Sequence, residues 1–120
     1  MKITDEVYNA MLEHAFSAVV PDVWEGIYTG ADVDEYITFA YEGRGMLYAN
    51  NKPKYLVRGT TVVLWVRNGV DAFLHKQKLK KAIISLGGTI PKEQVATDNA
   101  WQQYIFEFEH GCDYPYEEDS

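Results

Sequence analysis

Residues 36–67, YITFAYEGRGMLYANNKPKYLVRGTTVVLWVR, predict a long β-hairpin and thereby decide the fold. Residues 36–41 alternate between two faces, and residues 55–67 are rich in β-branched and aromatic side chains, which favour a strand. The connector at 45–55, GMLYANNKPKY, is too long for a two-residue turn, and Pro53 excludes it from a central strand. We therefore expect two strands joined by a projecting hairpin loop.

Three residues refine this expectation. Leu47 and Tyr48 are apolar and could extend the first strand toward the tip of the loop. Gly59 lies in the middle of the second strand, where a glycine often marks a bulge or a bend. We expect a lengthened first strand and an irregularity at Gly59.

A helix is expected at residues 4–18, before the hairpin. Thr4 can cap it, and Asp5 and Glu6 favour the positive end of its dipole. Pro21 ends the run. One half of the helical wheel carries the apolar residues Val7, Tyr8, Met11, Leu12, Ala15, Phe16 and Val19.

A second helix is expected within residues 70–88, VDAFLHKQKLKKAIISLGG, and the glycine pair at 87–88 closes it. Its apolar stripe contains Ala72, His75, Leu79, Ala82, Ile83 and Leu86. Phe73 and Ile84 lie outside this stripe. Either Phe73 folds back from the first turn onto the core, or the two residues form a small apolar patch for a partner.

Two further strands are expected near the C-terminus, a weak one at 92–97 and a strong alternating one at 101–109, WQQYIFEFE. The element order is then α-β-β-α-β-β. This order predicts an α+β fold, with two helices packed on a mainly antiparallel four-stranded sheet and a projecting β-hairpin loop. We expect a single domain at residues 1–111 and a flexible acidic tail at 112–120.

The charges are segregated along the chain, although the formal net charge is −7. Residues 1–43 contain nine acidic residues and one basic residue, residues 44–92 contain ten basic and one acidic, and residues 93–120 contain eight acidic and no basic. Either these charges neutralise one another within one molecule, or an acidic and a basic surface dock copies or partners face to face. The overall acidity argues against general nucleic-acid binding.

The sequence lacks the residue patterns of an active site or a metal centre. His14, His75 and His110 have no partner at metal-ligand spacing, and the lone Cys112 has no neighbouring base in the sequence. We expect His75 to be a partly buried, hydrogen-bonded histidine. No apolar run reaches the ~18 residues that a membrane span needs. We therefore expect no catalytic residue, cofactor, metal or membrane partner.

Five marks follow one another in a specific order: YITF at 36–39, LYANNKP at 47–53, the long strand after it, LGGTIP at 86–91 and YIFEFE at 104–109. Together they resemble the tail terminator proteins, also called tail completion or tail-to-head joining proteins, of long-tailed bacteriophages and prophages of Gram-positive bacteria. The resemblance covers residues 34–109. The chain departs from the family pattern in the length of VVLWVRNGV at 62–70 and in the acidic tail after Gly111.

The resemblance implies a non-catalytic subunit that closes into a ring, usually a hexamer, on top of the tail tube. Such a ring stops tube polymerisation at the correct length, binds the head connector protein and lets DNA pass without specific binding. The implied location is the head–tail interface of the virion, and the host cytoplasm before assembly. Two alternatives remain open. One is a head-completion protein, a stopper or adaptor of the same connector, and the other is a small acidic binding module of a prophage or bacterium.

The interface candidates come from the hairpin loop and from the second helix. Both segments combine basic residues with apolar residues that the predicted core does not use. These candidates are Tyr48, Asn50, Asn51, Lys52, Lys54, Phe73, Lys76, Lys80 and Ile84.

Overall fold

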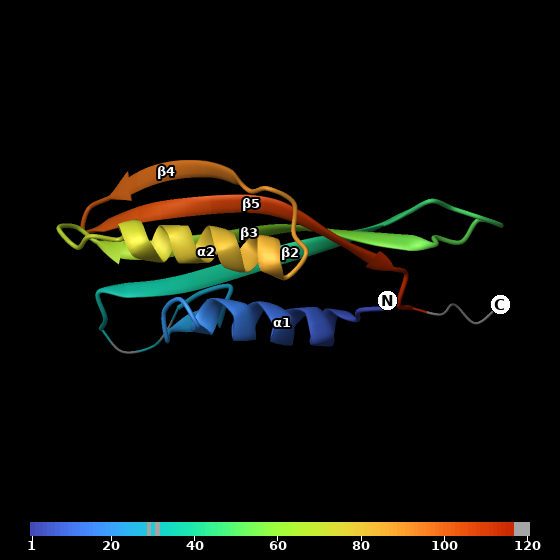
Figure 1. Ribbon diagram of the computed structural model, residues 1–120, viewed down its shortest axis with the longest axis horizontal. Helices are drawn as coiled ribbons and strands as arrows, with labels where there is room; N and C mark the ends of the chain where they lie inside the picture. The colour runs from blue at the N-terminus through green and yellow to red at the C-terminus, as the bar shows by residue number, and fades with distance from the viewer. Residues whose placement is uncertain (29, 31, 117–120) are drawn as a thin grey trace.

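The computed structural model describes residues 1–28, 30 and 32–116, and it has the expected α+β fold (Figure 1). The described residues form two helices and one sheet of five strands, in the order β1-β2-β3-β5-β4. The elements along the chain are α1 (Asp5–Ser17), β1 (Val23–Glu25), β2 (Glu35–Met46), β3 (Tyr55–Arg67), α2 (Phe73–Ser85), β4 (Lys92–Asp98) and β5 (Trp101–Asp113).

The expectation of four strands is wrong by one, because β1 joins the edge of the sheet. β1 pairs in parallel with β2, whereas β2 with β3, β3 with β5, and β4 with β5 are antiparallel, so the sheet is mixed. A strand of three residues is too short to display the alternation that reveals a strand in a sequence. This is why β1 was not predicted.

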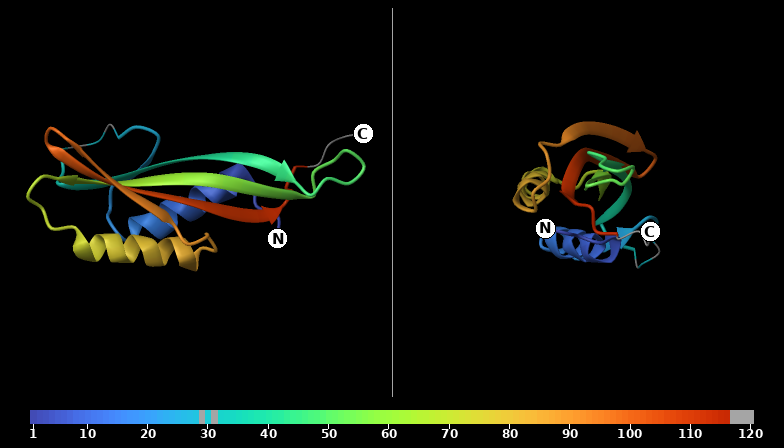
Figure 2. Two further views of the ribbon diagram at one scale, coloured as in Figure 1. Left: turned by 90° about the horizontal axis from the view of Figure 1, so that it is seen from above. Right: turned by 90° about the vertical axis from the view of Figure 1, so that its right-hand side faces the viewer.

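Both helices lie on one face of the sheet, and the core forms between them and the strands (Figure 2). Thr4 caps α1 as expected, since its Oγ1 accepts a hydrogen bond of 3.3 Å from the amide of Val7. Gly87, with φ of 98°, ends α2, and the amide of Gly88 donates to Ile83 O at 3.0 Å. Among the described residues no helix covers the opposite face, which we call the uncovered face.

The β2–β3 hairpin forms the long axis of the molecule, whose extents are 55 × 26 × 23 Å. Its register runs without interruption from Glu35 opposite Val66 to Met46 opposite Tyr55. Gly59 pairs in register with its neighbours in β2 and β5, so the expected bulge there is wrong. The first strand does extend beyond residue 41, but it ends before the expected Leu47 and Tyr48.

The C-terminal strand continues past the expected domain boundary at residue 111. β5 ends at Asp113, opposite Tyr55, and Cys112 is buried against the core. The N-terminal amine of Met1 also pairs with the Asp113 carboxylate at 2.9 Å. The sheet therefore includes the first two residues of the expected tail, and residues 117–120 of that tail lie outside the described residues.

Candidate functional site

The arm, which we define as residues 47–54, connects β2 to β3 at one end of the long axis (Figure 2). Its tip is a two-residue turn: Ala49 and Lys52 exchange backbone hydrogen bonds of 2.9 and 3.0 Å. Asn50 and Asn51 between them have φ of 54° and 61°, the left-handed values of a type I′ turn, which asparagine tolerates well. The expectation that this connector is too long for a two-residue turn is therefore wrong at its tip, where the arm narrows to such a turn.

The arm exposes apolar side chains that the core does not use. Leu47 is 70% exposed and Tyr48 is 64% exposed. Leu47 also has φ of 55°, a conformation that is unfavourable for a bulky side chain. A strained and exposed leucine contributes nothing to the core, and an observed outlier of this kind is a reason to suspect function.

Gly45 fixes the position of the arm on β2. A Cβ atom at Gly45 would lie 2.7 Å from Pro53 Cβ and 3.3 Å from the Tyr48 hydroxyl. Such a contact with the proline ring would force the arm to move, so only glycine allows this close approach. The glycine and the proline that interrupt the hairpin sequence therefore have one shared structural role.

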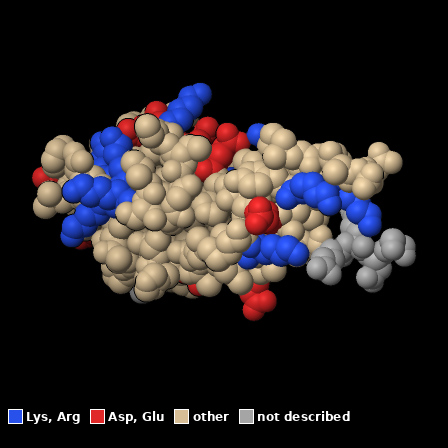
Figure 3. Space-filling model, turned by 45° about the vertical axis from the view of Figure 1, so that its right-hand side comes forward, with Lys and Arg blue, Asp and Glu red and all other residues tan. Residues whose placement is uncertain are grey.

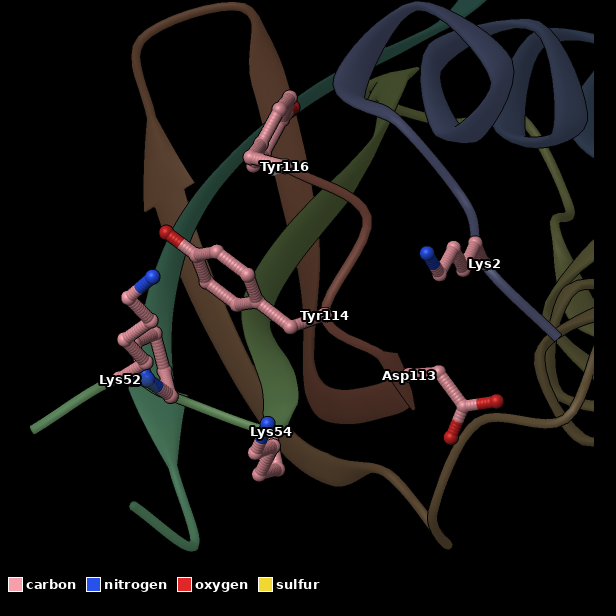
Figure 4. Close-up of a pocket in the computed structure, with 7 residues that line it drawn as sticks. Lys2, Lys52, Lys54, Asp113, Tyr114 and Tyr116 are labelled. Atoms are coloured by element: carbon pink, nitrogen blue, oxygen red, sulfur yellow. The ribbon is translucent and has the colours of Figure 1, made fainter. Parts of the chain in front are cut away.

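A shallow basic pocket of about 450 Å³ lies at the base of the arm (Figure 4). Lys52 and Lys54 line it on the arm side, Lys2 lies on the N-terminal side, and Tyr114 projects between them. Among the described residues that line it, Asp113 is the one acidic residue, and its carboxylate pairs with the N-terminal amine. The pocket is therefore suited to an anionic group, such as a carboxylate of a partner.

Arg58 joins the base of the hairpin to α1, although its side chain is completely buried. Its guanidinium donates to Asp5 Oδ1 at 3.0 Å and to Ile3 O at 2.7 Å, and it lies 5.0 Å from the centre of the Tyr8 ring. Burial raises the pKa of Tyr8 to about 12, and the hydroxyl of Tyr8 is hydrogen-bonded to Thr60 Oγ1. This polar layer was missed because the sequence shows no partner near Arg58.

The expected interface on α2 is only partly available. Lys76 lies 4.4 Å from the centre of the Tyr104 ring, and Lys80 pairs with Glu93 of β4 at 2.7 Å. Lys80 therefore fits the interpretation in which charges neutralise one another within one molecule, whereas Lys76 lies against an aromatic ring of the sheet. Figure 3 shows that Lys and Arg side chains gather near both ends of one face of the molecule.

Phe73 and Ile84 do remain exposed, by 62% and 53%. The alternative in which Phe73 folds back onto the core is therefore wrong. The two residues are separated by three helical turns, or about 16 Å, so they are not in contact with each other. The structure leaves them as two separate apolar points on α2, and Leu74 next to Phe73 is also exposed.

The sequence did not reveal a cluster of aromatic side chains on the uncovered face, which we call the aromatic ledge: Trp24, Tyr28, Tyr36, Trp65 and Trp101. Tyr36 lies at its centre. The Tyr36 ring stacks on Tyr28 at 4.3 Å and on Trp65 at 5.5 Å, and meets the edge of Trp101 at 5.2 Å. The alternation in β2 and β3 predicts which residues share this face, but the rings meet only because the strands pair in this register.

The aromatic ledge has an acidic surround. Desolvation raises the pKa of Tyr28, and the nearby carboxylates of Asp22 and Asp32 raise it further. Asp32 and Asp34 pair with Arg67, whose guanidinium lies 4.6 Å from the centre of the Trp101 ring. The ledge is thus a half-buried apolar platform with carboxylates at its rim.

His75 on α2 forms a local pair with β2. His75 is half-buried, as expected, and its Nδ1 pairs with Glu35 of β2. In the described part of the chain, no group of three His, Cys, Asp or Glu side chains is placed to hold a metal ion. The same residues contain no helix that is long and apolar enough to span a membrane.

The chain was also compared with known proteins. No protein-family model and no curated protein sequence matches it.

Proposed function

We propose that this chain is a structural assembly protein of a long-tailed bacteriophage or prophage. It caps the tail tube as a ring, expected to be a hexamer, and joins the tail to the head connector protein. DNA passes through the ring without specific binding. The protein acts at the head–tail interface of the virion, after synthesis in the host cytoplasm.

The observation that supports this proposal most is the arm. It projects from the end of the sheet and exposes Leu47 and Tyr48. It also carries Lys52 and Lys54, and residues 47–54 include no acidic residue. None of these side chains contributes to the buried core. Such an extension offers one surface of the chain to a different surface of another subunit, as a head-to-tail ring requires.

Electron microscopy of particles made without this protein tests the proposal. Overlong or headless tails would support termination of the tail tube. Heads that lack tails and leak DNA would instead favour the head-completion protein. Tails and heads of normal form and yield would contradict both roles.

A variant that lacks residues 50–54 separates the arm from the rest of the protein. Ala49 would then join Tyr55 across a short loop that leaves the register from Met46 inward intact. We expect this variant to fold and to give the same overlong or headless tails as the complete absence of the protein. Its circular dichroism spectrum and its monomeric state at low concentration provide the control for folding.

A further inference from the structure

We infer that the arm of one copy packs on the aromatic ledge of a second copy. This inference rests on the proposed function, because it names the surface that receives the arm when subunits assemble. The contact is head-to-tail: one surface of each copy meets a different surface of the next.

The arm cannot reach the ledge of its own molecule. Trp65 of the ledge and Tyr55 beside the arm are ten residues apart on β3, which corresponds to about 33 Å along the strand. The arm lies at one end of the long axis and the ledge near the other. Any contact between them is therefore a contact between two copies.

The two surfaces are complementary in charge. The arm carries Lys52 and Lys54, and the chain contains no acidic residue between Glu42 and Asp71. The ledge is bordered by four aspartates and one arginine: Asp22, Asp32, Asp34, Asp98 and Arg67. Opposite charges at the two ends favour a head-to-tail contact and disfavour a contact between two arms or two ledges.

The two surfaces are also complementary in polarity. Leu47 and Tyr48 are exposed apolar side chains, and their transfer from water onto an apolar surface is favourable. The ledge offers tyrosine and tryptophan rings, which are enriched in the centres of interfaces. Lysines pack well against such rings, and this chain already does so where Lys76 lies over Tyr104.

Nucleic acid is a less suitable occupant of the ledge. Aromatic rings can stack on bases, but single-stranded nucleic acid also requires a positively charged groove. The aspartates at the rim would repel phosphates, and Arg67 is already paired with Asp32 and Asp34. A basic peptide segment with apolar residues fits this platform, and the arm is such a segment.

Site-specific crosslinking tests the contact. Tyr48 is replaced with the photoreactive amino acid benzoylphenylalanine, and this protein is mixed with isotope-labelled wild-type protein at up to about 1 mM, where even weak complexes form. We expect crosslinks from residue 48 to labelled peptides that contain Trp24, Tyr36, Trp65 or Trp101. Crosslinks to α2 or to another arm, crosslinks within one copy only, or no crosslink at all would overturn the inference.

Charge exchange provides a second, independent measurement. Lys52→Glu with Lys54→Glu on the arm, or Asp22→Lys with Asp98→Lys at the ledge, should each reduce the crosslink yield about tenfold. The protein with all four changes should regain most of the yield. An undiminished yield with either pair alone would contradict the contact.

Failure of this inference differs from failure of the proposed function. If residue 48 crosslinks to another surface while removal of residues 50–54 still gives overlong tails, the inference is wrong and the function stands. If residue 48 crosslinks to the ledge while tails form normally without this protein, the contact stands and the proposed function is wrong.

Discussion

The body of the sheet and the arm come from the same hairpin, yet their apolar side chains have opposite environments. Ile37, Val62 and Leu64 are fully buried beneath the helices. Leu47 and Tyr48, in the arm that joins the two strands of this hairpin, are more than half exposed. The comparison shows that the body contains the buried core, whereas the arm leaves its apolar side chains exposed for other contacts.

Removal of a buried ring should give the largest loss of stability. Phe106 is 1% exposed on the helix-covered face, and Phe106→Ala should lower the free energy of unfolding by about 3–5 kcal/mol. Tyr48→Ala in the arm removes a ring of similar size but should change it by less than about 0.5 kcal/mol. Urea unfolding measures both values. Equal losses would show that the arm belongs to the core.

The next effect concerns the link between α1 and the base of the hairpin. Asp5→Ala removes the carboxylate partner of the buried Arg58, and Glu6→Ala removes a carboxylate from the same helical turn without that contact. Both variants lose the favourable interaction of a carboxylate with the helix dipole. The difference between their free energies of unfolding therefore reports the contact with Arg58. We expect Asp5→Ala to cost about 1–3 kcal/mol more than Glu6→Ala in urea unfolding. Equal costs would mean that the remaining partners of the guanidinium, among them Ile3 O and Cys112 Sγ, satisfy it without Asp5.

A smaller effect is expected from pH. Burial lowers the pKa of His110 and the charge of Arg58 lowers it further, so the folded protein resists protonation of this side chain. Below the unfolded pKa of about 6.5 the unfolded chain binds more protons, and the free energy of unfolding falls by up to about 1.4 kcal/mol per pH unit until the folded pKa is reached. Above that unfolded pKa the contribution is fully present.

His110→Gln removes this titration and is the matched variant. Urea unfolding of both proteins at about pH 7.5 and about pH 5.5 gives the difference in pH dependence. We expect the wild type to lose more stability on acidification than His110→Gln. The same loss in both proteins would assign the pH dependence to other titratable groups. Nδ1 of His110 is the one buried side-chain polar atom among the described residues that lacks a hydrogen-bond partner, and this fits a neutral ring.

Much of the fold followed from the sequence because its signals are local. Alternation and β-branched residues predicted β3 with its ends at Tyr55 and Arg67. The cap at Thr4 predicted the start of α1, and the glycines at 87–88 predicted the end of α2. β1 was missed because three residues are too few to show the alternation of a strand. Gly59 misled because a glycine is compatible with a regular strand as well as with a bulge.

The candidate site was only partly predictable. The arm was expected from its length and from Pro53, and its exposure is confirmed. The internal use of Lys76 and Lys80, the buried Arg58 and the aromatic ledge depend on residues far apart in the chain, and register brings them together. Such contacts leave no local pattern in a single sequence.

The central claim is that the arm is a device for assembly that the fold does not need. The most direct test replaces two leucines that are both 70% exposed, Leu47 in the arm and Leu74 on α2, with asparagine. Asparagine tolerates the positive φ at position 47, so Leu47→Asn should stabilise the isolated subunit by up to about 1 kcal/mol. Leu74→Asn should destabilise it slightly, because asparagine is a weaker helix former than leucine.

The measurement is the yield of particles with tails of normal length when each variant replaces the wild-type protein. We predict that Leu47→Asn, although at least as stable as the wild type, lowers this yield strongly, and that Leu74→Asn leaves it near the wild-type value. A normal yield with Leu47→Asn, or an equal loss with both variants, would contradict the role assigned to the arm.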